Sequence, residues 1–187
     1  MKQVKQSKAE TLRAKDIMNQ HPVTVGPHDS LQTAMELMVE NHVTGLAVID
    51  GADRCMGVLS GTDILRYEQD HAEERAEVNS DLARYFDQMT RRWEDVRLTS
   101  YALEKLAELE VDDIMSRDLI SVRPETPLRT VAKKMLEQEV HRVVVVGRDN
   151  RLIGLITSID FVRLAARGTS NEKPPARRRP RSSAARK

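Results

Sequence analysis

The chain has 187 residues, of which 40% are apolar, with one cysteine and a formal net charge of +1. This length and apolar content are enough to bury the core of about one compact domain, and one cysteine excludes an internal disulfide framework. The polar start has no apolar stretch to act as a secretory signal, and no run approaches the ~20 apolar residues that cross a bilayer. We therefore expect a cytoplasmic protein with no membrane span.

The main body of the chain is a two-copy repeat that follows a polar N-terminal segment, residues 1–13. Shifted by 97 positions, residues 16–66 align with residues 113–163 without a gap. Two copies are too few for a solenoid, so we predict two similar units packed face to face around one core. Repeat 1 is assigned to residues 14–67 and repeat 2 to residues 111–167.

Each copy is predicted as strand, helix, strand, strand, helix, and its first helix has the clearest pattern. Apolar residues recur at i, i+3, i+4 and i+7, which is one face of an amphipathic helix. The residues in this pattern are Leu31, Ala34, Met35 and Met38 in the first copy and Leu128, Val131, Ala132 and Met135 in the second. Ser30 or Asp29 can cap the first helix, and Thr126 followed by Pro127 gives the second helix a cap and an initial proline.

The two strands after this helix are predicted to pair as a hairpin. Leu46–Asp50 and Val143–Val146 are apolar runs followed by polar turns, so they are candidates for buried strands. In the strand after each turn, Gly57 and Gly154 stand at matching positions. A glycine inside a strand indicates a bend or a close approach of another backbone.

Residues 68–110 form an acidic insert between the copies, with twelve acidic and six basic residues and no proline or glycine. We predict that this insert is helical, because its apolar residues follow helical spacing in two stripes. The stripes are Leu82, Tyr85 or Phe86, Met89, Trp93 and Val96, then Leu103, Leu106 and Leu109 or Val111. The insert either packs on its own domain or presents the Trp93 stripe to a second subunit or another protein.

Residues 168–187 are predicted to be a disordered basic tail. From Glu172 to Lys187 there are seven basic residues, one acidic residue and three prolines, and this composition cannot form a core. The tail carries a charge of +6 in a chain whose net charge is +1, so the rest of the protein is acidic. The tail is either a solvated terminus or a weak contact for nucleic acid or anionic lipid.

Both copies open with Asp-Ile-Met and Thr/Ser-Val-x-Pro, and both close with glycine, two apolar residues and Ser/Thr-x-x-Asp. This gapless pair resembles tandem CBS domains, which are named after cystathionine β-synthase. The resemblance implies an α/β (α+β) fold of two βαββα repeats packed pseudo-symmetrically, here with the helical insert between them. It also implies a disc-shaped homodimer and a ligand such as AMP, ADP, ATP, S-adenosylmethionine or a cyclic dinucleotide, although some such pairs have no known ligand.

The polar residues that close each copy are the main candidates for ligand binding. A hydroxyl that ends a strand and a carboxylate in the next helical turn lie beside free backbone N–H groups, which suit a phosphate. The carboxylate repels phosphate but can accept hydrogen bonds from ribose hydroxyls. The resemblance accordingly assigns ribose to Asp63 and Asp160 and phosphate to Ser60 and Thr157. Alternatively, both carboxylates only cap their helices.

The start of the second strand differs between the copies, since His141-Arg142 in repeat 2 replaces Thr44-Gly45 in repeat 1. Two cationic or hydrogen-bonding groups at this point suit phosphate oxygens. The run Val-His-Arg-Val-Val-Val-Val is also similar to the phosphate-contacting strand of the AMP-activated kinase regulatory subunit, which implies a phosphate role for both residues. The alternative is that the arginine is a solvated charge at a strand start.

Two short strand segments complete the candidate nucleotide site. Thr24-Val25 and Ser121-Val122 would offer backbone hydrogen bonds and apolar contact to a purine, although taken alone they are ordinary strand residues.

Other constellations favour structural roles. We interpret Asp112-Asp113 as a helix cap, because repeat 1 has only Asp16 there, and Cys55 as a small core residue. The remaining histidines are His21, His28, His42 and His71, and they show no metal-ligand spacing. The sequence has no Gly-rich phosphate loop, nucleophile elbow or paired catalytic carboxylate, so we predict neither a metal site nor an enzyme.

We predict a stand-alone regulatory module that holds an adenine-containing nucleotide, AMP, ADP or ATP, in the cleft between its two repeats. No covalent cofactor is expected. The module is expected to be a homodimer that signals to an unknown effector protein. The alternative is a ligand-free interaction scaffold whose basic C-terminal tail contacts nucleic acid.

Overall fold

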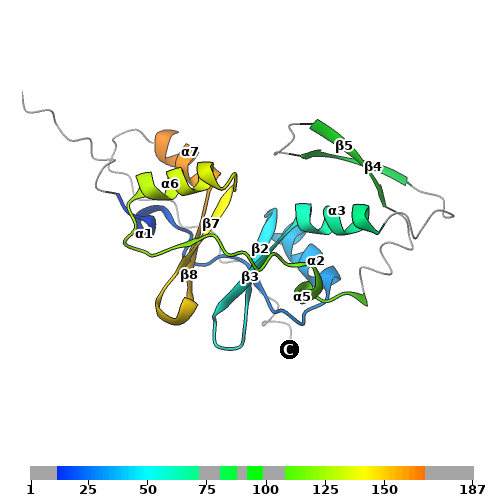
Figure 1. Ribbon diagram of the computed structural model, residues 1–187, viewed down its shortest axis with the longest axis horizontal. Coiled ribbons are helices and arrows are strands. Elements are labelled where there is room, and N and C mark those ends of the chain that lie inside the picture. Colours follow the sequence, from blue (N-terminus) through cyan, green and yellow to red (C-terminus); the bar gives the residue numbers. More distant parts are fainter. Residues whose placement is uncertain (1–11, 72–80, 88–91, 99–107, 167–187) are drawn as a thin grey trace, which may run out of the picture. The chain divides into compact units, whose positions relative to one another are not determined.

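The computed structural model describes residues 12–71, 81–87, 92–98 and 108–166 (Figure 1). Its elements are α1 (Ala14–Ile17), β1 (Thr24–Val25), α2 (Leu31–Asn41), β2 (Gly45–Ile49), β3 (Cys55–Ser60), α3 (Gly61–Asp70), β4 (Asp81–Asp87), β5 (Arg92–Leu98), α5 (Val111–Ile114), β6 (Ser121–Val122), α6 (Leu128–Glu137), β7 (Arg142–Val146), the 3₁₀ turn η3 (Arg148–Asn150), β8 (Leu152–Thr157) and α7 (Ser158–Ala166). The order strand, helix, strand, strand, helix occurs twice, which confirms the predicted repeat. The predicted basic tail lies outside the described residues.

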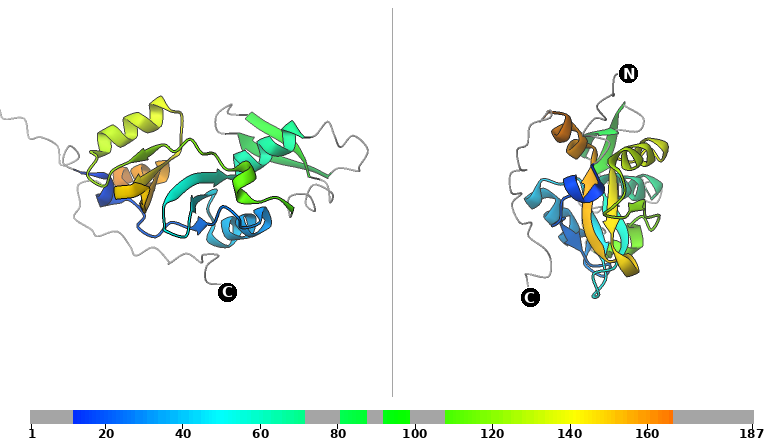
Figure 2. Two further views of the ribbon diagram at one scale, coloured as in Figure 1. Left: turned by 60° about the horizontal axis from the view of Figure 1, so that its bottom comes forward. Right: turned by 90° about the vertical axis from the view of Figure 1, so that its left-hand side faces the viewer.

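Each repeat builds a three-stranded sheet, in the order β1-β2-β3 or β6-β7-β8. In repeat 2, β6 is parallel to β7 and β7 is antiparallel to β8, so the last two strands form the predicted hairpin. Val143–Val146 of the central strand are all buried, as expected for a strand with both faces covered. The helix α6 packs along this sheet (Figure 2). The fold is therefore the predicted mixed α+β class.

The apolar faces of α2 and α6 are buried, as predicted. The buried residues of the pattern are Leu31, Ala34 and Met38 in α2 and Leu128, Val131 and Met135 in α6. These side chains fill the cores of the two repeats. Among the described helices, none combines the length and the apolar character needed to cross a membrane.

The predicted helix caps are correct in one repeat and wrong in the other. Ser30 Oγ accepts a hydrogen bond from the backbone N–H of the third residue of α2, at 3.1 Å. Thr126 does not cap α6, because its Oγ1 instead accepts from the N–H of Arg123, at 3.1 Å. At the matching positions of repeat 1, Asp29 Oδ2 accepts from the N–H of Gly26, at 2.8 Å. Thr126 and Asp29 therefore share one role, which is to close the turn before the helix.

The described chain divides into two compact units, and each unit contains the segment that opens the other repeat. Unit 1 comprises residues 12–22, 52–55 and 119–166, and unit 2 comprises residues 23–51, 56–71 and 108–118 with the two insert strands. We call residues 12–19 and 109–116, which carry the two Asp-Ile-Met motifs, the docking segments. This exchange was not predicted from the sequence.

Apolar residues of the docking segments complete the two cores. Val111 and Met115 are buried in the core that repeat 1 forms. Ala14 is buried in the core of repeat 2, where Ile17 and Met18 pack against it. Burial of such side chains stabilises the docked segment by about 1.5–3 kcal/mol for each large apolar residue.

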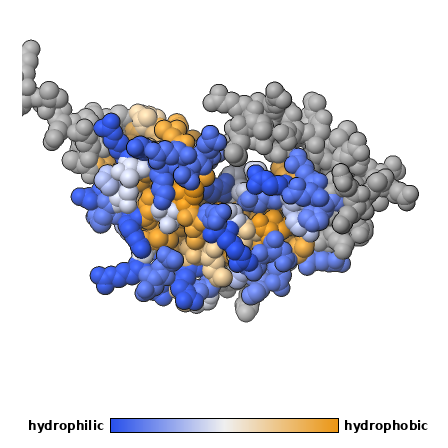
Figure 3. Space-filling model, viewed as in Figure 1, coloured by the Kyte–Doolittle hydropathy of each residue, from blue (hydrophilic) through white to orange (hydrophobic). Residues whose placement is uncertain are grey.

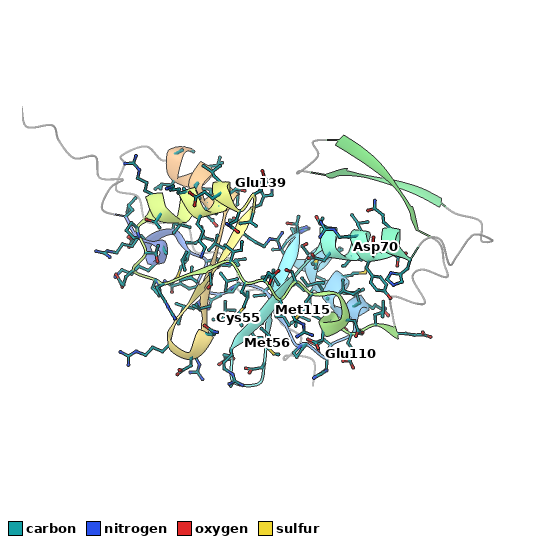
Figure 4. The ribbon with its side chains drawn as sticks, in the orientation of Figure 1. Cys55, Met56, Asp70, Glu110, Met115 and Glu139 are labelled. Atoms are coloured by element: carbon teal, nitrogen blue, oxygen red, sulfur yellow. The ribbon has the colours of Figure 1, made fainter. Side chains whose placement is uncertain are left out.

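The docking segments explain both strand glycines. A Cβ added to Gly154 would lie 2.7 Å from the carbonyl oxygen of Asn19, and one added to Gly57 would lie 2.7 Å from that of Ser116. The methionine sulfur of the motif would be 2.9 Å away or less in both cases. Figure 4 labels the methionine of unit 2, Met115. The predicted close backbone approach is therefore confirmed at both glycines.

Each docking segment forms an ion pair with its unit. The segment supplies the cation in unit 1 and the anion in unit 2. In unit 1, Lys15 Nζ lies 2.9 Å from Glu125 Oε1, and Arg13 Nη1 lies 3.7 Å from Glu125 Oε2. In unit 2, Glu110 Oε2 lies 2.8 Å from His28 Nδ1. Glu125 matches His28 in the repeat, and Arg13 matches Glu110. Exposed pairs contribute little stability, but like charges would face each other if the segments changed places, so charge favours the observed docking.

We expect the His28–Glu110 pair to stabilise the fold at mildly acidic pH and to lose this effect at alkaline pH. The hydrogen bond that His28 donates to Glu110, and next the charge of Glu110, raise the pKa of His28 above its usual 6.5. A raised pKa in the folded state means that the contribution is complete below the unfolded value and is lost as the pH rises through the folded value. Denaturation of wild type and Glu110→Gln from about pH 5 to about pH 9 tests this.

The difference between their unfolding midpoints should shrink as the pH rises, and a difference that grows would contradict the assignment. The Lys15–Glu125 pair is the matched control. The hydrogen bond from Lys15 lowers the pKa of Glu125, so that pair loses its contribution on acidification instead.

The prediction of a helical insert is wrong for the residues that the structure describes. Asp81–Asp87 and Arg92–Leu98 form an antiparallel hairpin whose register pairs Phe86 with Trp93. Aromatic residues favour strands, and they favour positions that face each other in antiparallel pairs. Here this preference outweighs the helical spacing of the apolar residues. The Trp93 stripe is therefore not a helix face. Met89 and the second predicted stripe up to residue 107 lie outside the described residues.

Candidate functional site

The predicted phosphate and ribose residues of repeat 2 lie together at one corner of its sheet. Arg142 begins β7 and is the register partner of Thr157, which ends β8. The N–H of Ser158 donates to the carbonyl oxygen of His141, at 3.0 Å. Adjacent strands are about 4.8 Å apart, so these two strand ends are direct neighbours. Asp160 follows in the first turn of α7, and the structure therefore brings all four predicted residues together.

The carboxylate of Asp160 is buried, and hydrogen bonds from Thr157 and Arg163 help to hold it. Its Oδ2 accepts from the N–H of Thr157 at 2.9 Å and from Thr157 Oγ1 at 2.8 Å. Its Oδ1 accepts from Arg163 Nη1 at 3.2 Å. These bonds show that Asp160 ties the end of β8 to the start of α7, as the helix-cap interpretation requires. Its ribose role remains a prediction.

The predicted purine-contact residues of repeat 2 lie one strand away from this corner. Ser121 and Val122 form β6, and their register partners on β7 are Val144 and Val145. Val122 is buried, whereas Ser121 is partly exposed. The carbonyl oxygen of Ser121 accepts a hydrogen bond from Lys134 Nζ, at 2.9 Å. A second cation of repeat 2 thus lies beside the predicted site.

Repeat 1 forms the same corner with fewer cations. The N–H of Gly61 donates to the carbonyl oxygen of Thr44, at 3.2 Å, in place of the Ser158–His141 bond. The backbone N–H and Oγ of Ser60 donate to Asp63 Oδ2, at 2.7 and 2.5 Å. Thr24–Val25 is parallel to β2, as β6 is to β7. All four predicted residues of repeat 1 therefore occupy positions equivalent to those of repeat 2.

Two basic residues near the repeat 2 corner were missed at the level of sequence. Arg163 lies three residues after Asp160, a spacing at which side chains on one helix can meet. Lys134 replaces Leu37 of repeat 1 within an otherwise apolar face. The three-residue spacing from Asp160 could have identified Arg163, and the difference between the two copies could have identified Lys134.

The weaker constellations have the structural roles that were predicted. Asp113 Oδ2 accepts from the N–H of Glu110 at 2.9 Å, and Asp16 Oδ2 accepts from that of Arg13 at 2.7 Å, so both carboxylates cap their short helices. Cys55 is 4% exposed and is a core residue.

Two βαββα repeats in tandem define a known class of domain pair. The model described as CBS domain matches residues 14–70 and 111–167, and the chain belongs to the CBS domain family. The chloroplastic CBS domain-containing protein CBSX1 of Arabidopsis thaliana is 33% identical over 141 residues, which cover 75% of this chain. The chain spans 58% of the length of that relative.

Solved structures support the same fold. The crystal structure of CBSX2 in complex with AMP is 29% identical, with a TM-score of 0.58, and the match covers 83% of this chain and 96% of that one. The CBS domain pair of protein MJ0100, solved with 5′-methylthioadenosine and S-adenosyl-L-methionine, has a TM-score of 0.58 at 20% identity and covers 83% and 97%. The predicted CBS pair is confirmed, and the CBSX2 and MJ0100 structures were both solved with adenine-containing ligands.

Proposed function

We propose that this chain is a regulatory module that binds an adenine nucleotide, AMP, ADP or ATP, and signals to an effector protein. The observation that carries this proposal is the strand-end corner that occurs twice. In each corner a hydroxyl residue and a carboxylate are bonded together, as Ser60 with Asp63 and Thr157 with Asp160. Binding of AMP by CBSX2 supports an adenine ligand for this chain too.

The proposal gives each predicted residue a chemical role. The carboxylates of Asp63 and Asp160 accept hydrogen bonds from ribose hydroxyls, because an ionised carboxylate only accepts. His141 and Arg142 bind phosphate oxygens, because a guanidinium can donate two parallel hydrogen bonds to them. Ser60 and Thr157 lie at the phosphate, and Thr24, Val25, Ser121 and Val122 contact the purine.

We expect the loss of either carboxylate to weaken AMP binding. Asp63→Asn and Asp160→Asn keep an oxygen for the helix start but remove the charge, and hydrogen bonds to charged groups contribute about 1.5–3 kcal/mol. Each substitution should therefore weaken its own site by about tenfold to a hundredfold. Calorimetric titration of AMP into the full chain measures this. Unchanged affinity in both folded variants would reject the assignment.

A thermal-shift screen tests the proposal independently of any variant. A ligand that binds only the folded state stabilises it by about 2.7 kcal/mol at a hundredfold excess over Kd. AMP, ADP, ATP, S-adenosylmethionine and cyclic dinucleotides are the compounds to screen. No stabilisation by any of them, together with salt-sensitive nucleic-acid binding that is lost on deleting residues 173–187, would favour the ligand-free scaffold.

We also propose that the chain forms a homodimer. The helices α2 and α6 expose one large apolar side chain each at matching positions, Val39 at 74% and Leu136 at 79%. Ile159 and Val162 of α7 are exposed as well. Figure 3 shows hydrophobic surface among hydrophilic residues on the face that it displays. Exposed apolar surface of this kind supports an interaction face, and sedimentation equilibrium would measure the mass.

A binding role, rather than an enzymatic one, is part of the proposal. Each corner carboxylate accepts hydrogen bonds from a hydroxyl group and a backbone N–H group at the start of a helix, which is the arrangement of a helix cap. The cytoplasmic location stays a prediction, since relatives such as CBSX1 are named as chloroplastic.

A further inference from the structure

The two candidate ribose carboxylates are not equally accessible. The Asp160 side chain is 2% exposed, and Arg163 bonds to the oxygen that Thr157 does not use. Asp63 is partly exposed. Both bonds from Ser60 end on its Oδ2, and its Oδ1 accepts no hydrogen bond from any residue that the structure describes.

The asymmetry does not come from a missing arginine. Arg66 stands at the position of repeat 1 that matches Arg163. Among the described residues, Arg66 forms no ion pair with Asp63, although both helices start with the same bonded pair of hydroxyl and carboxylate. An arginine three residues after the carboxylate therefore pairs with Asp160 in repeat 2 but not with Asp63 in repeat 1.

A ribose needs the oxygen that Arg163 uses. Two adjacent ribose hydroxyls are two donors, and they bind a carboxylate best when both of its oxygens have lone pairs left to accept. At Asp160, Oδ2 already accepts two hydrogen bonds from Thr157. The Arg163 side chain is 51% exposed, so solvent can take over its hydrogen bonds when it leaves. Because Asp160 itself is buried, the ligand's hydroxyls must replace the hydrogen bond that Arg163 gives up, and only the arginine returns to water.

Resting on the proposed function, we propose that Arg163 is a specificity-determining latch on the ribose carboxylate of repeat 2. It occupies Asp160 Oδ1 until a ligand with a vicinal diol displaces it, whereas repeat 1 accepts the diol without displacement. The latch lowers the affinity of repeat 2 for every ribonucleotide and has no effect on ligands that lack the diol. The two corners therefore fill at different concentrations of one nucleotide.

The test isolates each corner and removes its arginine. In an Asp63→Asn background only the repeat 2 carboxylate remains, and Arg163→Gln is added there. Removing the latch should tighten AMP binding by about twofold to fivefold, because the ligand no longer has to displace an arginine whose side chain is half exposed. Binding of 2′,3′-dideoxy-AMP should not change. The matched control is Arg66→Gln in an Asp160→Asn background, which should leave AMP affinity unaltered.

The outcomes separate the latch from the function on which it rests. Unchanged or weaker AMP binding after Arg163→Gln would overturn the latch, and so would equal gains for AMP and its dideoxy analogue. A third outcome also overturns the latch: wild type binds AMP, Asp63→Asn abolishes the binding, and adding Arg163→Gln does not restore it. Repeat 2 would then bind no ribose. No binding of AMP to wild type would instead reject the proposed function.

Discussion

Gly154→Ala is expected to destabilise the folded chain by about 1–3 kcal/mol, the usual cost of inserting atoms into a packed interior. The new methyl group would meet the backbone oxygen of Asn19 at 2.7 Å, and backbone cannot rotate away as a flexible side chain can. The docking segment would have to shift, and the hydrogen bonds between Asn19 and Leu155 would shift with it. Urea denaturation of wild type and variant measures the change.

Two further glycines serve as matched variants. Gly57→Ala should cost a similar amount, because its Cβ would lie 2.7 Å from the carbonyl oxygen of Ser116. Gly51→Ala should be nearly neutral, because no atom lies within 4 Å of its added Cβ. Equal effects at all three positions would mean that the docking segments do not constrain the strands.

Arg142→Ala is expected to remove most of the preference of repeat 2 for AMP over adenosine. A guanidinium can donate two parallel hydrogen bonds to a phosphate and none of similar strength to a neutral 5′-hydroxyl. At about 1.5–3 kcal/mol for a charge-assisted bond, AMP affinity should fall by about tenfold to a hundredfold while adenosine affinity stays nearly constant. Calorimetry with both ligands in an Asp63→Asn background measures this.

Arg148→Ala is the matched control for that experiment. Arg148 is an exposed arginine in the turn at the opposite end of β7, so its loss should leave both affinities unaltered. Equal losses of AMP and adenosine affinity in Arg142→Ala would mean that Arg142 supports the strand and does not recognise the phosphate.

The fold was predictable from the sequence because its two copies carry the same local signals. The apolar face from Leu31 to Met38 recurs 97 residues later, and both copies of the pattern are buried. The insert was mispredicted because its apolar spacing is compatible with a helix, whereas its aromatic residues pair across a hairpin, as Phe86 does with Trp93. Local periodicity cannot detect a strand partner.

The exchange of docking segments could not be predicted because both segments carry the same motif. Met18 and Met115 are interchangeable by type, and only their charged neighbours distinguish the two docking positions. Glu110 pairs with His28, whereas Lys15 pairs with Glu125, and such complementarity becomes visible only once the contacts are known.

The candidate site was predicted as a set of positions but not as a set of contacts. The repeat pattern located Ser60, Asp63, Thr157 and Asp160, and the structure brings each pair together. The role of Arg163 depends on which rotamer reaches the carboxylate. The contrast with Arg66 shows that spacing on the helix does not decide this.

A crystal structure of the full chain grown with saturating AMP tests the central claim most directly. We predict that the ribose hydroxyls lie within about 3 Å of the carboxylate oxygens of Asp63, or of Asp160 once Arg163 has moved away. The phosphate at repeat 2 should lie beside Arg142. A bound AMP that touches neither carboxylate, or a chain that holds no AMP at saturation, would contradict the account.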